Sequence, residues 1–82
     1  MKKYKELPFK NASVLLKNTD ELYKLLLVLD VYDVNWLQGQ RPLDYKTKID
    51  IEKYLIIEYK NISLRQNYKS SILLLEDLLL EL

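Results

Sequence analysis

The stretch NTDELYKLLLVLD, residues 18–30, predicts the main helix of this chain, and the neighbouring segments are best interpreted from it. Asn18 stands three residues before Glu21, which is the capping-box spacing that starts many helices. The leucines that follow at helical spacing form one stripe suited to face a core: Leu22, Leu25, Leu26 and Leu29. Leu27 and Val28 lie outside this stripe, so the helix is more apolar than one packing face requires.

Short runs rich in β-branched and aromatic residues predict strands on both sides of this helix. ASVLLK (12–17) precedes it, whereas KYLIIEY (53–59) and ISLRQNY (62–68) follow later and carry the strongest strand signals. Only Lys60 and Asn61 separate the last two runs, which predicts a two-residue hairpin turn at these positions. The expected pairs are Tyr59 with Ile62 and Ile57 with Leu64 on an apolar face, and Glu58 with Ser63 and Ile56 with Arg65 on a mixed face that also carries Tyr54.

The segment VYDVNWLQGQRP (31–42) holds the only tryptophan, the only glycine and one of the two prolines of the chain. We expect a short strand with Val34 and Trp36 here, and Trp36 in the core, because a lone tryptophan beside a turn usually marks packing. Gly39 supplies the positive φ that a tight turn needs. The polar residues that come next, RPLDYKTKID (41–50), predict a loop.

The last segment, SILLLEDLLLEL (71–82), predicts an extended start and then a short helix whose stripe is Leu75, Leu78, Leu79 and Leu82. Together these elements predict an α+β fold, with a small antiparallel sheet packed against one main helix and a short C-terminal helix. Residues 1–11 are expected to form an N-terminal arm, and residues 12–82 a single α+β domain.

The composition argues against several classes of function. Without histidine and cysteine, the chain lacks the commonest general base, the commonest metal ligand and any thiolate. Its carboxylates, such as Asp44, Asp50 and Glu52, are too widely spaced for a Mg²⁺ site. We therefore predict no enzymatic activity, no catalytic residue, no metal and no cofactor.

The charge balance and the lengths of the apolar runs argue against further classes of partner. With 13 basic and 12 acidic residues the net charge is +1, which argues against a nucleic-acid partner. The longest apolar runs, LLLVL and ILLL, fall well short of the ~20 residues that a membrane span needs. The high content of Lys, Asn, Ile and Tyr is typical of A/T-rich genes, as in low-GC Gram-positive bacteria and their phages, and the absence of cysteine favours an intracellular protein. We therefore expect the cytoplasm of an infected low-GC Gram-positive bacterium.

The order of the elements resembles that of the small β-α-β-β-α proteins encoded by phage genomes, over about residues 12–82. Val34, Trp36 and Gly39 match their Trp-x-x-Gly turn, and LEDLL (75–79) approximates their closing acidic-leucine segment. Leu74 stands where a Ser or Thr cap is usual, and Leu78 where Phe is usual. The resemblance implies an accessory protein, a class that includes inhibitors of host or defence machinery, and it implies no catalytic residue.

Seven tyrosines in 82 residues favour a protein partner, because tyrosine is enriched at interface cores. We therefore predict a protein that binds and inhibits a host or defence protein, through Tyr54, Ile56 and Arg65 of the hairpin and Tyr45 of the loop. One alternative is a small-ligand or nucleotide binder that uses Trp36 and Arg41. Another is a homodimeric structural module joined through the C-terminal leucines.

Overall fold

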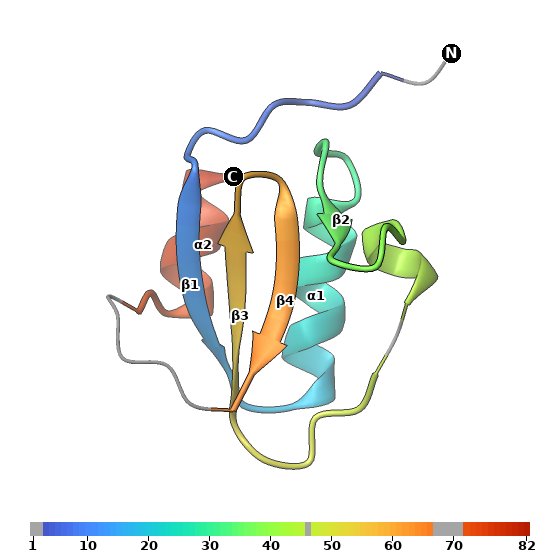
Figure 1. Ribbon diagram of the computed structural model, residues 1–82. Helices are drawn as coiled ribbons and strands as arrows, with labels where there is room; N and C mark the ends of the chain where they lie inside the picture. Colours follow the sequence, from blue (N-terminus) through green and yellow to red (C-terminus); the bar gives the residue numbers. More distant parts are fainter. Residues whose placement is uncertain (1–2, 46, 67–71) are drawn as a thin grey trace.

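The structure of the chain is a computed structural model, and it describes residues 3–45, 47–66 and 72–82. In chain order its elements are β1 (Asn11–Leu16), α1 (Thr19–Leu29), β2 (Asn35–Trp36), the 3₁₀ turn η1 (Pro42–Asp44), β3 (Lys53–Glu58), β4 (Asn61–Arg65) and α2 (Leu75–Glu81). The strands form one sheet in the order β1-β3-β4-β2, and both helices lie behind it (Figure 1). The predicted α+β class, with one main helix and a short C-terminal helix, is confirmed.

The sheet is mixed, which corrects the expectation of an antiparallel one. β3 is antiparallel to both of its neighbours, β1 and β4, whereas β2 is parallel to β4. The reason lies in the connection between β1 and β2. α1 carries the chain back along the sheet, so β2 starts in the same direction as β1, and the β3–β4 hairpin is inserted between these two strands.

Helix α1 begins and packs as its sequence predicts. The Asn18 side chain accepts a hydrogen bond of 2.9 Å from the Glu21 N–H, and the Glu21 carboxylate accepts one of 2.7 Å from the Lys17 N–H. All members of the predicted leucine stripe are fully buried: Leu22, Leu25, Leu26 and Leu29. Leu27, outside the stripe, is 61% exposed.

The β3–β4 hairpin turns one residue earlier than predicted, which moves each pairing partner by two residues. Glu58 pairs with Asn61, so the turn residues are Tyr59 and Lys60, and the predicted turn at Lys60 and Asn61 is wrong. The pairing partners shift by two residues, so the side chains within both strands keep their predicted face of the sheet. Tyr59 is the exception, because it leaves the predicted apolar face and enters the turn, where it is 72% exposed. Ile62 now pairs with a residue on each side, Ile57 of β3 and Trp36 of β2. β4 ends at Arg65, and the last predicted positions, 67 and 68, lie outside the described residues.

The segment with the single tryptophan follows the prediction except at Val34, which lies just before β2 and not in it. Trp36 is 3% exposed in the core, and its indole N–H donates to the Pro42 carbonyl at 3.1 Å. Gly39 has a φ of 97°, which confirms its role in the turn. The predicted loop, residues 41–50, contains the short turn η1.

Both ends of the chain contact the domain. Main-chain hydrogen bonds join Lys5 to Val31 and to Asp33, and the partly buried Leu7 and Phe9 pack against the core. Near the other end, α2 buries Leu75 and Leu78 of its predicted stripe. Segments far apart in the sequence therefore close the core on the helix side of the sheet.

Candidate protein-interaction surface

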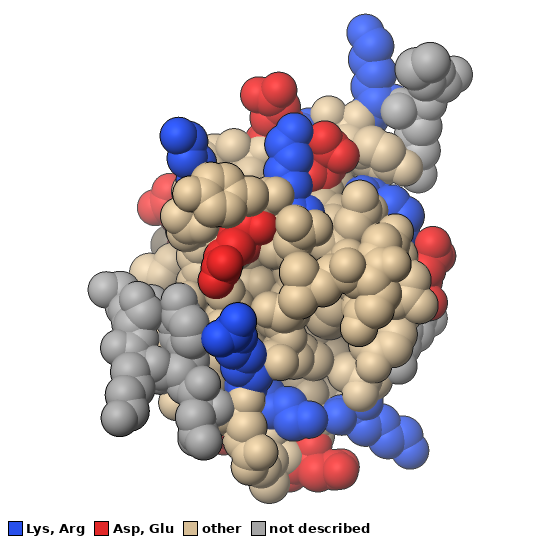
Figure 2. Space-filling view, in the orientation of Figure 1, with Lys and Arg blue, Asp and Glu red and all other residues tan. Residues whose placement is uncertain are grey.

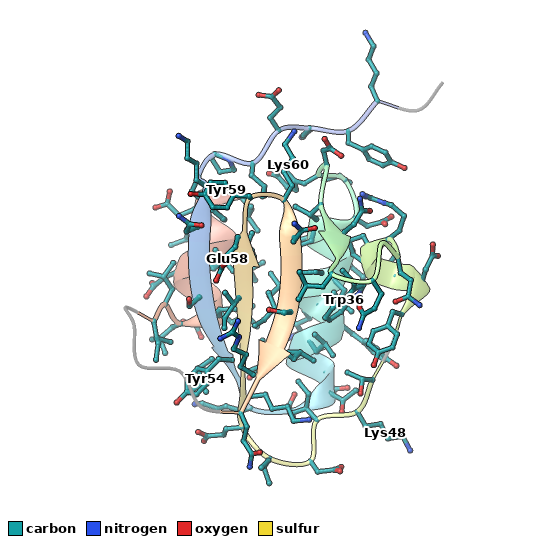
Figure 3. The ribbon with its side chains drawn as sticks, viewed as in Figure 1. Trp36, Lys48, Tyr54, Glu58, Tyr59 and Lys60 are labelled. Atoms are coloured by element: carbon teal, nitrogen blue, oxygen red, sulfur yellow. The ribbon has the colours of Figure 1, made fainter. Side chains whose placement is uncertain are left out.

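The face of the sheet turned toward the viewer in Figure 1 is covered by neither α1 nor α2. Cross-strand pairing arranges its side chains in rows: Asn11–Glu58–Asn61, Ser13–Ile56–Ser63 and Leu15–Tyr54–Arg65. Figure 3 shows Tyr54 and Glu58 near opposite ends of this open face. The pairing thus brings the predicted contact residues Tyr54, Ile56 and Arg65 onto one face.

These residues differ in how much surface they present to a partner. Ile56 occupies the middle of the rows, between Ser13 and Ser63, and is only 2% exposed. Arg65 is exposed and pairs with the half-buried Tyr54. Contact from this face would therefore come mainly from Tyr54 and Arg65, with Ile56 as the support beneath them.

The turn between β3 and β4 places an aromatic side chain at the tip of the hairpin. Tyr59 and Lys60 both have positive φ values, 47° and 71°, as a type I′ turn requires of its central residues. Asn and Gly are the residues that adopt this conformation readily, and a tyrosine there costs about 1 kcal/mol or more. Tyr59 is nevertheless 72% exposed, so its ring gains little from packing. Strain of this kind, without a gain in the core, favours a functional role.

Shallow hollows surround this tyrosine. One of about 430 Å³ separates it from the N-terminal arm and is lined by Glu6, Leu7, Phe9, Lys10, Tyr59 and Lys60. A second, of about 170 Å³, is lined by Leu37, Glu58, Tyr59, Asn61, Ser63 and Arg65. Tyr59 and Lys60 stand together at the top of the sheet in Figure 3, below the N-terminal arm. The tip is therefore an accessible ridge between two depressions.

A third hollow, of about 290 Å³, continues this surface along β4. Its lining residues are Trp36, Leu37, Gln38, Tyr45, Thr47, Lys53, Ile62, Ser63 and Leu64. Leu37 and Ser63 line both this hollow and the one beside Tyr59. Leu37 is 65% exposed, which is unusual for a leucine beside a core tryptophan. We name the connected set the β4 surface: Leu37, Tyr45, Tyr54, Tyr59, Ser63 and Arg65.

The predicted contact residues do not include three members of this surface, Tyr59, Leu37 and Ser63. The predicted strand 53–59 includes Tyr59, whereas the observed pairing of β3 with β4 places Tyr59 in the turn between them. Its exposure therefore depends on the register of that pairing. The signal for Leu37 was its place between Trp36 and Gly39, since a tight turn beside a buried tryptophan turns the next side chain outward. Tyr45, predicted as a partner residue, packs edge-on against Trp36 with a ring separation of 5.2 Å. It therefore lies beside Leu37 at the margin of the third hollow.

The two residues predicted for ligand binding are engaged inside the protein. Trp36 is buried, as described above, and the Arg41 guanidinium donates to three main-chain carbonyls. The distances from its Nη atoms to the carbonyl oxygens are 2.6 Å for Val34, 2.7 Å for Asp30 and 2.9 Å for Tyr32. The Tyr4 ring also lies 4.0 Å from the guanidinium carbon. These contacts use the ring and the donors that a nucleotide would need.

Charge is unevenly distributed over the open face. In Figure 2 an area without Lys, Arg, Asp or Glu side chains extends from β4 across β2, while charged side chains lie over the rest of the face and its margins. At the top margin, Lys60 Nζ and Asp33 Oδ2 form an exposed ion pair at 3.1 Å. A partner that covers the uncharged area would desolvate few charges, which favours contact with another protein.

Among residues 3–45, 47–66 and 72–82, no group of three acidic side chains is placed to hold a metal ion. Neither helix in this part of the chain has the length and apolar character needed to cross a membrane. Comparison with protein-family models, with curated proteins and with solved structures finds no significant match for this chain.

Proposed function

We propose that this chain is a protein-binding module and that the β4 surface is its contact site. The observation that carries the proposal is the exposed, conformationally strained Tyr59 at the tip of the sheet, next to the exposed Leu37. Tyrosine and arginine are the residue types that most often dominate binding energy, and Tyr54 and Arg65 lie side by side on the adjoining face. Bulky exposed apolar groups next to such residues are typical of interaction sites.

The finer proposal is that binding inhibits a host or defence protein in the bacterial cytoplasm. Its support is the resemblance of the Trp36–Gly39 turn and of residues 75–79 to those of phage accessory proteins. The near-neutral charge of the chain also supports a protein partner over a nucleic acid.

The test is affinity capture of the tagged chain from a low-GC Gram-positive lysate, with bound proteins identified by mass spectrometry. We expect one stoichiometric partner that is lost with the double variant Tyr54→Ala/Arg65→Ala and with Leu37→Asp. The matched control is Leu27→Asp on α1, because Leu27 is 61% exposed and Leu37 is 65% exposed. Equal loss with both aspartate variants, or capture unaffected by either β4-surface variant, would overturn the site.

A homodimer is the competing outcome, and sedimentation at several concentrations separates it from the proposal. A monomer at all concentrations, together with one captured partner, supports the binding module. A concentration-dependent dimer that dissociates when Leu80 is replaced by Asp would support association through the C-terminal helix. Leu80 is the natural residue for this test because it is 85% exposed on α2.

A further inference from the structure

We propose that the partner of the β4 surface contributes an extended segment that adds to the sheet as a further strand, beside the C-terminal half of β4. The proposal rests on the proposed function, since it specifies how the same surface is used. It arises from a difference between the two edges of the sheet.

In the middle of β1, over Ser13–Leu15, the edge of the sheet is occupied by the chain itself. Leu15 N–H donates to the Leu73 carbonyl at 3.3 Å, and Leu73 N–H donates to the Ser13 carbonyl at 2.7 Å. Within the part of the chain that the structure describes, the edge at β4 is paired only over Asn61 and Ile62, with β2. In Figure 1, β2 lies beside the upper part of β4 alone. The chain leaves β4 after Trp36, through the turn at Gly39.

The main chain of Leu64 faces this open part of the edge. The Ile62 carbonyl accepts from the Leu37 N–H at 3.2 Å, so the polar groups of Ile62 point toward β2. Main-chain groups alternate along a strand, so the N–H and C=O of Leu64, two residues later, point the same way. No hydrogen bond from the described residues reaches them. An extended chain offers an acceptor and a donor at the matching spacing.

The hollow beside Leu64 selects the kind of side chain that such a segment carries. Its volume is about 290 Å³, and among the described residues Lys53 is the one charged residue in its lining. Leu37 and Tyr45 supply exposed apolar surface at its margin. Since alternate side chains of an added strand point to the same face, one uncharged side chain of the segment would enter this hollow. The occupant is therefore an extended, uncharged segment of another protein.

The test begins with amide hydrogen exchange of the free, full chain, measured residue by residue with NMR. The Leu64 amide should exchange much faster than those of Ser63 and Arg65, which point toward β3. A phage-displayed library of random peptides is then selected on the immobilised chain, and the selected peptides are synthesised. At saturation they should slow exchange of the Leu64 amide by about tenfold or more. Selected peptides that leave this amide unprotected, or a selection that yields no peptide, would overturn strand addition.

Two variants test whether peptide binding depends on the open edge at Leu64 and on the hollow beside it. Leu64→Pro removes the donor on the open edge and none of the hydrogen bonds to β3, so it should weaken peptide binding by about tenfold or more. Leu37→Asp should weaken it similarly, whereas Leu27→Asp should not. If Leu64→Pro lowers the far-UV circular dichroism, the exchange measurement on the unaltered chain decides. Capture of a lysate partner without protection of Leu64 leaves the proposed function standing and overturns only the added strand.

Discussion

The two tight turns that flank β4 are built from opposite kinds of sequence. The turn after Trp36 contains the only glycine, which takes the positive φ, and its neighbours Trp36 and Arg41 point inward. The turn at Tyr59 and Lys60 also needs positive φ, but neither residue is suited to it, and Tyr59 points outward. In the first turn, a glycine suited to positive φ accompanies side chains that pack inside the protein. In the second turn, residues that disfavour positive φ accompany an exposed side chain.

The strained turn persists because main-chain contacts hold it from both sides. Tyr59 N–H donates to the Lys10 carbonyl at 3.1 Å, and the Lys60 carbonyl accepts from Asn35 N–H at 2.9 Å. The surrounding structure thus fixes a conformation that the residues themselves disfavour. The two turns should therefore respond to substitution in opposite ways.

The largest effect is expected at the inward-facing turn. Trp36→Ala should lower the free energy of unfolding by about 3–5 kcal/mol, because it leaves a cavity in the core. Urea denaturation followed by circular dichroism measures this, and Trp36→Phe is the control that retains an aromatic ring. A loss below about 1 kcal/mol would show that the tryptophan is not a core residue, and the contrast between the turns would fail.

The next effect concerns the guanidinium that closes the same turn. Arg41→Ala should lower the free energy of unfolding by about 2–3 kcal/mol, since buried carbonyls lose charge-assisted hydrogen bonds. Arg41→Lys should recover only part of this loss, because an ammonium cannot reproduce the planar array of donors. The same urea titration tests both. Equal stability of Arg41→Lys and the unaltered chain would show that charge alone is needed.

At the outward-facing turn, substitution should raise the free energy of unfolding and not lower it. Replacing Tyr59 by Asn together with Lys60→Gly should raise the free energy of unfolding by about 1–2 kcal/mol, because the pair Asn-Gly suits a type I′ turn. The same variant should lose capture of the partner. A thermal melt and the affinity capture are performed on one preparation, so that a loss of binding cannot be ascribed to unfolding. Unchanged stability would remove strain as evidence for function.

The smallest effect is expected from the ion pair at that turn. Asp33→Asn removes the partner of Lys60, and because both side chains are about half exposed, the loss should be about 0.5 kcal/mol or less. The difference should vanish in ~1 M salt, where exposed charges are screened. A loss that persists at high salt would indicate that the Asp33 main chain, which donates to Lys5, has moved.

The predictable parts of this fold are those with local causes. Asn18, Glu21 and the leucine stripe specify α1 within a few turns of chain, so the helix could be predicted. The hairpin register could not, because an alternating pattern is unchanged by a two-residue slip. The observed register brings Ile62 beside Trp36, a contact with a segment far away in sequence. Strand order and the direction of β2 depend on such contacts as well.

The same difference between local causes and contacts distant in sequence decides which residues of the candidate site could be predicted. Tyr54, Ile56 and Arg65 could be placed on one face because the slip preserves faces, but the burial of Ile56 depends on β1, which no local pattern reveals. The contacts of Arg41 could not be predicted because its acceptors are main-chain carbonyls, and these leave no trace in a sequence. Tyr59 was missed because its exposure exists only in the observed register.

The Arg41 contacts also bear on the order in which the chain folds. The start of α1 is capped by its immediate neighbour Asn18, whereas its last turn contains no basic residue. Among the described residues, Arg41 brings a positive charge to this end, where it donates to the Asp30 carbonyl. The first half of the helix can therefore nucleate early, but its final turn becomes stable only after the following segment has folded back. A fragment that ends before residue 41 should keep the beginning of this helix and fray at its end.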